Sequence, residues 1–437
     1  MALPNLINYQ EPLLMLPPET NNTLIACVPT GSGTFGPSSI IQVDLGSRGF
    51  LDPASLSIRY KMTYTTAVNA AGLGVVGTPV YTPIARLETL VNSTSVEQIN
   101  NYNVVANLLT NLRLGVSEKY GQQSALGYEQ STSAGAAIVP SLDQLDGYVT
   151  TTATTATTID RFYSAPLHGL LAGAEKLIPL FLLNNIRLQF SLDTVSNIQS
   201  ALAAQSAAIT NFSISNFEVV YNCVDMGSAV EREVIAMNPK IRIKSNSFFT
   251  GVQQVASAAS GTLNLVYNAR YASVKSAFLV MGGGNIAISC NRMFDSYDIT
   301  SGTGDYQLSI GQNLYPQKAL STVNSRSAIL NELRRAMGSI FDKNTSMSIN
   351  SIEYATPSST VTTVVQPGKF FVGVNTQKLT VPVKAFFTGV STQNAPITAI
   401  INIGATATAQ IHNIMIVLNY DSIMEIDSST KQCILIQ

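Results

Sequence analysis

The segment SNFEVVYN, residues 215–222, returns near the C-terminus as HNIMIVLN, residues 412–419. Two asparagines and one valine coincide, and both segments are rich in the β-branched and aromatic residues that favour strands. Each reads as the closing strand of a β-sandwich. Because self-similarity within a chain is a strong indicator of architecture, the match predicts two copies of one fold.

A second match supports the repeat. Only residues 103–114 and 325–337 place apolar side chains three and four positions apart, which is typical of an amphipathic helix. The coinciding positions are Leu109, Leu112 and Arg113 in the first segment and Leu330, Leu333 and Arg334 in the second. The two matches occur in the same order, so we predict two copies joined near residues 226–240, each with one short helix.

The remainder of the chain has the sequence pattern of many short strands. Runs rich in Val, Ile, Thr, Tyr and Phe alternate with Gly, Pro, Asn and Ser. The clearest runs are residues 39–45, 55–66, 186–192, 217–224, 241–255, 261–280, 369–374 and 411–420. Polar stretches at 132–160, which contains TTTATTATT, and at 357–367 read as long loops outside the sheets. An all-β protein follows.

The composition indicates self-association. Apolar residues make up 46% of the 437 positions and charged residues only 12%, with a formal net charge of −1. A surface covered by Ser, Thr, Asn and Gln does little to repel copies of itself. Lys and Arg form no cluster that could neutralise a run of phosphates, so we expect no direct or sequence-specific nucleic-acid binding.

The N-terminal segment, residues 1–37, is predicted to be an arm that becomes ordered on a partner. It lacks the basic start and continuous apolar stretch of a signal peptide, so we expect synthesis in the cytosol without secretion. Nowhere does the sequence approach the roughly 20 uninterrupted apolar residues that span a bilayer.

Two glycine-rich segments partly match phosphate-binding loops. Residues 72–77, GLGVVG, satisfy the dinucleotide-binding pattern, but Pro79 and Pro83 forbid the helix that would hold the pyrophosphate. A flexible loop is the favoured interpretation. Residues 281–285, MGGGN, end a strand and lack the Lys-Ser/Thr that follows a phosphate loop.

Titratable residues give little support for catalysis. His412 lies in the closing strand and reads as structural, whereas His168, in a loop-like junction, leaves a nucleophile–base pair open. Asp295 and Asp298 could bind a cation, with solvated turn residues favoured. The scattered cysteines, Cys27, Cys223, Cys290 and Cys433, read as free thiols and not as a zinc site. We therefore predict no catalytic, cofactor-binding or metal-binding residues, and no enzyme.

The helices leave one question open. Their leucines could simply cover an end of their own sandwich, or their polar faces could contact other subunits. The residues concerned in the second case are Arg113, Arg334 and Arg335.

Residues 43–60, VDLGSRGFLDPASLSIRY, resemble the first strand, tight Asp-Pro turn and second strand of double jelly-roll viral major capsid proteins. That family is the tectivirus and adenovirus lineage, which includes polinton-like and lipid-containing icosahedral viruses. Tyr315-Pro316 before the second helix and Asn419-Tyr420-Asp421 in the terminal strand add to the resemblance.

The resemblance implies two consecutive eight-stranded jelly rolls, residues 38–230 and 231–437, after the arm at 1–37. It also implies homotrimeric, pseudo-hexagonal capsomers, trimer–trimer contacts in an icosahedral virion, penton and minor capsid partners, and an arm that reaches an internal membrane. A carbohydrate-binding β-sandwich surface protein is the alternative, and the absence of tryptophan argues against it because sugar platforms rely on stacked aromatic rings.

Overall fold

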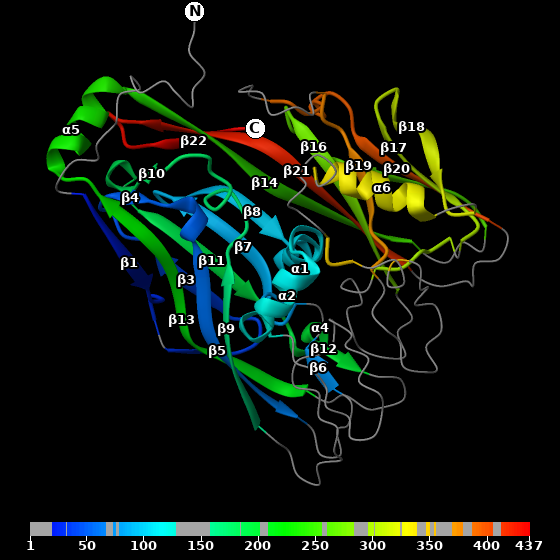
Figure 1. The fold of residues 1–437 in the computed structure, drawn as a ribbon, viewed down its shortest axis with the longest axis horizontal. Helices are drawn as coiled ribbons and strands as arrows, with labels where there is room; N and C mark the ends of the chain where they lie inside the picture. Colours follow the sequence, from blue (N-terminus) through cyan, green and yellow to red (C-terminus); the bar gives the residue numbers. More distant parts are fainter. Residues whose placement is uncertain are drawn as a thin grey trace, which may run out of the picture.

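The computed structural model describes most of the chain as antiparallel strands in two units (Figure 1). The described residues are 20–31, 33–66, 73–75, 78–127, 158–183, 185–201, 209–255, 260–283, 296–300, 302–323, 326–338, 347–349, 354, 369–378, 387–404 and 412–437. Of the loops predicted at 132–160 and 357–367, residues 132–157 and 357–367 lie outside the described residues, whereas residues 158–160 begin a strand and are not part of a loop.

The first unit is a sandwich of two sheets. One sheet has the order β1/β2, β13, β5, β9, where β1 and β2 both pair with β13, and the other has the order β3, β11, β7, β8. The strands are β1 (Asn21–Cys27), β2 (Thr34–Phe35), β3 (Ile40–Asp44), β5 (Ser57–Thr66), β7 (Ile84–Val91), β8 (Thr94–Asn100), β9 (Thr158–Pro166), β11 (Ile186–Leu192) and β13 (Ile209–Asp225). Short strands β4 (Phe50–Leu51) and β10 (Ile178–Pro179) extend the first sheet.

The second unit repeats this topology. Its sheets have the orders β14, β21, β16, β19 and β15, β20, β17, β18. The strands are β14 (Lys240–Val255), β15 (Gly261–Tyr267), β16 (Val274–Gly283), β17 (Asp305–Ile310), β18 (Asn313–Ser321), β19 (Val372–Asn375), β20 (Ile397–Ile403) and β21 (His412–Asp427), with β22 (Cys433–Ile436) added to β21. In both units the first, eighth, third and sixth strands face the second, seventh, fourth and fifth, which is the jelly-roll arrangement.

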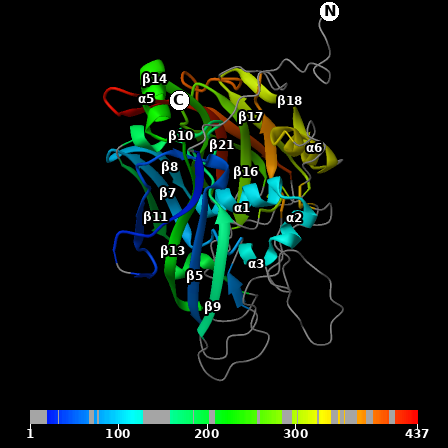
Figure 2. The same cartoon turned by 60° about the vertical axis from the view of Figure 1, so that its left-hand side comes forward.

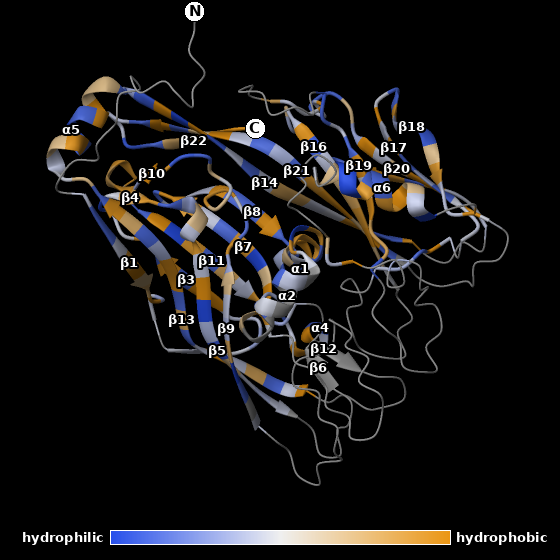
Figure 3. Cartoon of the chain, in the orientation of Figure 1, coloured by the Kyte–Doolittle hydropathy of each residue, from blue (hydrophilic) through white to orange (hydrophobic). Residues whose placement is uncertain are grey.

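Each core follows from alternation along the strands. In β11 and β20 every second residue is buried and the residues between them are half-buried, as the period of two in a strand dictates. Phe190 of one sheet meets Phe217 of the facing sheet with ring centroids 5.0 Å apart. Figure 3 shows the apolar residues of these strands interleaved with polar ones.

Two helices occupy equivalent places in the repeat. α1 (Tyr102–Arg113) follows β8, and α6 (Arg326–Ala336) follows β18, which confirms both predicted helices. Residues 102–112 of α1 are all buried because the helix lies where the two units meet (Figure 1). Ser348 of the second unit donates its hydroxyl to the carbonyl of Asn111, at 3.0 Å.

The prediction of one helix in each copy was wrong for the first unit. The first unit also contains three short helices, α2 (Val116–Gly121), α3 (Gln123–Leu126) and α4 (Val195–Ile198), which are too short for an apolar period to be visible. α5 (Ser228–Met237) links the units and buries none of its residues. In both views it lies at one end of the molecule, away from α1 (Figures 1 and 2).

The N-terminal arm predicted over residues 1–37 is too long. β1 pairs residue by residue with β13, from Asn21 opposite Asp225 to Cys27 opposite Val219, and so occupies the first strand position of the jelly roll. Consequently β3 and β5 are its second and third strands and lie in different sheets, contrary to the prediction of a first and second strand. The turn between them is as expected, since Asp52 accepts a hydrogen bond from the Ala54 N–H at 3.1 Å.

Two further predictions need correction. The apolar run at 261–280 is divided between β15 in one sheet and β16 in the other. Residues 73–75 of the glycine-rich segment form a short strand, β6 (Leu73–Val75), paired with β12 (Gln199–Ala201), where a loop was predicted. Among the described helices, none is both long and apolar enough to cross a membrane.

Candidate assembly surfaces and the joint between the units

Glu97 is buried at the joint between the two jelly rolls, where β8 of the first unit lies against β14 of the second. Only 3% of the residue is exposed. Its carboxylate accepts hydrogen bonds from the Leu170 N–H at 2.8 Å, from the Thr89 hydroxyl at 3.2 Å and from the hydroxyl of Ser247 on β14. Burial raises the pKa of Glu97 to about 7, although these three hydrogen bonds act in the opposite direction.

Further hydrogen bonds cross the same joint. The Thr250 hydroxyl donates to the Asn100 carbonyl at 2.8 Å, and the Ser245 hydroxyl donates to the Leu170 carbonyl. The Glu175 N–H donates to the Lys244 carbonyl at 2.9 Å. The two units are therefore held together by specific polar contacts of the backbone as well as by packing.

A glycine allows a close approach of the two backbones at this joint. A Cβ atom on Gly173 would lie 2.3 Å from Oδ1 of Asn246 and 2.7 Å from its carbonyl oxygen. These distances are far below van der Waals contact, so only glycine fits against β14 here.

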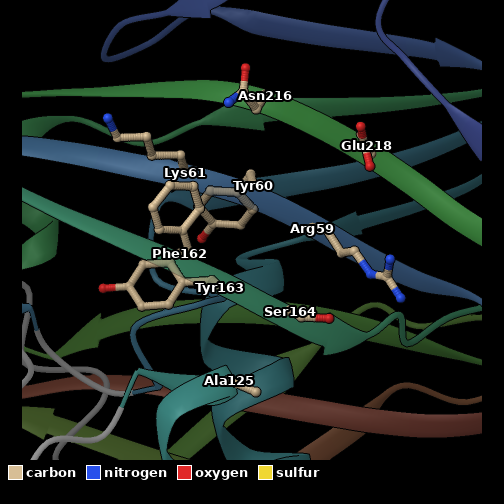
Figure 4. A pocket seen from close by; sticks show the side chains of 9 residues that line it. All are labelled: Arg59, Tyr60, Lys61, Ala125, Phe162, Tyr163, Ser164, Asn216 and Glu218. Atoms are coloured by element: carbon tan, nitrogen blue, oxygen red, sulfur yellow. The ribbon is translucent and has the colours of Figure 1, made fainter.

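A shallow groove lies on the outer face of the β13–β5–β9 sheet (Figure 4). Its volume is about 450 Å³, and Phe162 on β9, 69% exposed, stands beside Lys61 on β5. The Lys61 ammonium lies 5.8 Å from the Phe162 ring centroid and 2.8 Å from the carboxylate of Asp160. An exposed phenylalanine is a candidate anchor for a protein–protein contact, because aromatic residues are enriched at interfaces.

The end of the molecule that carries α5 also exposes apolar side chains. Ile235 and Met237 of α5 are exposed, as are Ile434 and Ile436 of β22. α5 and β22 lie at the same end in Figure 1. Large exposed aliphatic side chains at one end of the molecule are candidates for contact with a partner.

Asp298 is not the solvated turn residue that the sequence favoured. It is 2% exposed and accepts hydrogen bonds from the Tyr306 hydroxyl at 2.8 Å and from the N–H groups of Thr300 and Gly302, each at 3.0 Å. The guanidinium of Arg326 completes the set, with Nη2 3.2 Å from Oδ2. This arrangement satisfies the carboxylate with protein donors and ties α6 to the sheet.

Among the described residues, no serine forms a hydrogen bond with the His168 ring, so the nucleophile–base pair that the sequence left open is not formed there. Its ring packs against Tyr81, with centroids 5.5 Å apart, and its backbone N–H donates to the Tyr102 hydroxyl at 2.9 Å. Burial and the nearby charge of Arg113 lower the pKa of His168 to about 3, so the ring is neutral near pH 7. His412 begins β21, as predicted.

The other sequence candidates are dispersed. Cys223 is buried, and Cys27 and Cys433 are partly buried free thiols, whereas Cys290 and Asp295 lie outside the described residues. Within the described part of the chain, no group of three or more His, Cys, Asp and Glu residues could hold a metal ion.

The helix arginines point to different roles. The guanidinium of Arg113 lies 5.9 Å from the ring centroid of Phe248 in the second unit, so this residue contributes to the joint within one chain. Arg335 forms an exposed ion pair with Glu332 at 2.8 Å. The sequence did not indicate Glu97, because TSVEQIN reads as an ordinary half-exposed strand.

No protein-family model matches the sequence, and no curated protein matches it. Solved structures do match over nearly the whole chain. The Faustovirus major capsid protein has a TM-score of 0.57 at 10% identity, covering 97% of this chain and 92% of that one. The mavirus major capsid protein has a TM-score of 0.56 at 10% identity, covering 100% and 95%.

A chain of the cryo-EM structure of the Sputnik virophage has a TM-score of 0.60 at 12% identity, covering 100% of this chain and 92% of that chain. These TM-scores show a shared fold, and at identities of 10–12% the likeness is one of fold alone. Together with the two equivalent strand orders, they show that this chain is a double jelly roll of the kind found in these viral structures.

Proposed function

We propose that the chain is a viral major capsid protein whose function is assembly into trimeric, pseudo-hexagonal capsomers of an icosahedral shell. The observation that carries this proposal is the whole-chain likeness to the Faustovirus and mavirus major capsid proteins, which includes both jelly rolls and their connection. The role is structural and involves no catalytic step.

The repeat supports a sixfold outline. One chain supplies two similar units side by side, so three chains related by a threefold axis supply six, and six similar units tile a flat facet. Charged residues make up 12% of the sequence, about half the usual share in soluble proteins, which suits a chain surrounded by copies of itself.

Distinct surfaces would serve distinct partners. The groove at Phe162 would contact another copy of the chain, within a trimer or between trimers. The end that carries α5 and β22 would face the inside of the virion. β1 also begins at this end, because Asn21 lies opposite Asp225, three residues before the start of α5. Minor capsid proteins, penton proteins and an internal membrane are the proposed partners of the shell.

We propose two domains, with residues 20–227 in the first and 238–437 in the second, linked by α5. This division moves the start of the first domain from residue 38 to residue 20 because β1 pairs with β13. The proposed site of synthesis is the host cytosol, and the proposed final location is the virion.

Electron microscopy of the purified protein tests the assembly proposal. The expected particles are hexagonal in outline with six similar lobes. At high protein concentration these particles are expected to associate into sheets or shells. Isolated two-lobed particles at every concentration would contradict the proposal.

A further inference from the structure

We infer that Glu97 and Ser247 form a protonation-controlled latch that holds the two jelly rolls of one chain together. The latch lies within a single chain and does not depend on the proposed capsid function. The Glu97 carboxyl group is buried inside the joint and does not lie on the surface of either unit.

The latch joins elements from both units. Thr89 on β7 and Leu170 after β9 belong to the first unit, as does Glu97 itself, whereas Ser247 on β14 belongs to the second. Ser247 is fully buried. A Cβ on Gly169 would lie 3.0 Å from Oε2 of Glu97, so the carboxyl group is closely enclosed on that side as well.

The charged groups on the surrounding elements are engaged elsewhere or neutral. On β7, Arg86 and Glu88 lie 3.3 Å apart, and on β14, Lys244 lies 3.3 Å from Glu175 of the loop after β9. His168 in that loop is neutral near pH 7.

The remaining neighbours are aromatic or paired with other groups. Arg113 of α1 lies over the ring of Phe248. Tyr102 of α1 and Tyr420 of β21 have pKa values raised by burial and stay neutral. Asp421 of β21 pairs with Lys275 at 2.9 Å. Among the described residues, no Lys or Arg forms an ion pair with Glu97.

The closed joint is therefore more stable with Glu97 protonated than with Glu97 ionised. A protonated carboxyl is neutral and can donate to the Ser247 or Thr89 hydroxyl, so the closed joint suits it well. An ionised carboxylate keeps its three hydrogen bonds but carries a buried charge without a counter-ion. Parting β14 from β8 would let water reach that charge.

The direction of the pH dependence of joint closure follows from the raised pKa of Glu97. A carboxyl with a pKa of about 7 in the closed state and 4.5 in the open state favours closure at low pH. The opening equilibrium rises about tenfold per pH unit between 4.5 and 7 and levels off above 7. The latch is closed in mild acid and weakened at neutral and alkaline pH.

Hydrogen–deuterium exchange of the full chain at pH 5.0 and pH 8.5, corrected for the intrinsic pH dependence of exchange, tests this inference. Peptides that cover residues 94–100, 167–175 and 240–250 are expected to lose protection by a factor on the order of 100 at pH 8.5. Peptides from β11 and β20, away from the joint, are expected to change little.

Glu97→Gln keeps the shape of the side chain but cannot ionise, so the pH effect on the joint peptides should fall below about threefold. Glu88→Gln, on the neighbouring strand, is the matched control and should behave like the wild type. If Glu97→Gln does not fold, Ser247→Ala decides, because the loss of a hydrogen bond to the carboxylate should enlarge the pH effect. An unchanged pH effect in Glu97→Gln or in Ser247→Ala, or none at the wild-type joint, would overturn the inference.

Discussion

Nη2 of Arg326 lies 3.2 Å from Oδ2 of Asp298, and this pair fastens α6 to a buried turn of the second jelly roll. The Asp298 carboxylate also accepts from the Tyr306 hydroxyl, so its removal would leave several donors without an acceptor. Asp298→Ala is expected to lower the free energy of unfolding by about 3 to 5 kcal/mol, measured by urea denaturation.

The exposed ion pair between Arg335 and Glu332 provides the comparison for that variant. Glu332→Ala should change the free energy of unfolding by less than about 1 kcal/mol, because surface pairs contribute little. Equal changes in the free energy of unfolding for Asp298→Ala and Glu332→Ala would show that the contacts of Asp298 do not stabilise the fold more than a surface ion pair does.

Gly173→Ala is expected to weaken the joint between the jelly rolls. Its Cβ would lie 2.7 Å from the backbone carbonyl oxygen of Asn246, so β14 must shift, and the free energy of unfolding should fall by about 1 to 3 kcal/mol. Gly36→Ala is the control, because a Cβ on Gly36 meets nothing within 4 Å. A melting temperature of Gly173→Ala equal to that of Gly36→Ala would contradict this description of the joint.

Truncation distinguishes the arm from the first strand. Deletion of residues 1–19 should leave the melting temperature within about 2 °C of the wild type, because β1 and its pairing with β13 remain. Deletion of residues 1–27 removes β1 and exposes the edge of β13, so a fall of roughly 5 °C or more is expected. A fall of that size in the shorter deletion would place residues 1–19 in the folded core.

Phe162→Ser should affect association and not folding. The side chain is 69% exposed, so the melting temperature of the isolated chain should change little, whereas assembled species should dissociate at a lower dilution factor. Val323→Ser, another exposed apolar position, is the matched control. Assembly that survives Phe162→Ser unchanged would remove the groove from the proposed contacts.

Local pattern was sufficient for much of the fold. β11 spans residues 186–192 as predicted, because its alternation is unbroken, and the repeat at 215–222 and 412–419 does fall in the eighth strand of each unit. The helices α1 and α6 were found because an apolar period of three to four residues survives over three turns.

The misses share a physical cause. NNTLIAC in β1 begins with three polar residues and is mostly exposed, and only its pairing with β13, some 200 residues away, makes it a strand. Asp298 sits in a turn-like sequence, and its burial depends on Arg326 and Tyr306. Glu97 is buried by β14, 150 residues farther along the chain, so no local pattern could indicate its role.

Light scattering of the purified protein tests the central claim most directly. The account predicts a stable species of three times 46.6 kDa that persists on dilution, because three double jelly rolls complete the sixfold outline. A monomer of 46.6 kDa at every concentration tested would contradict the capsomer proposal. The double jelly-roll fold would stand, but the protein would have a function other than forming trimeric capsomers.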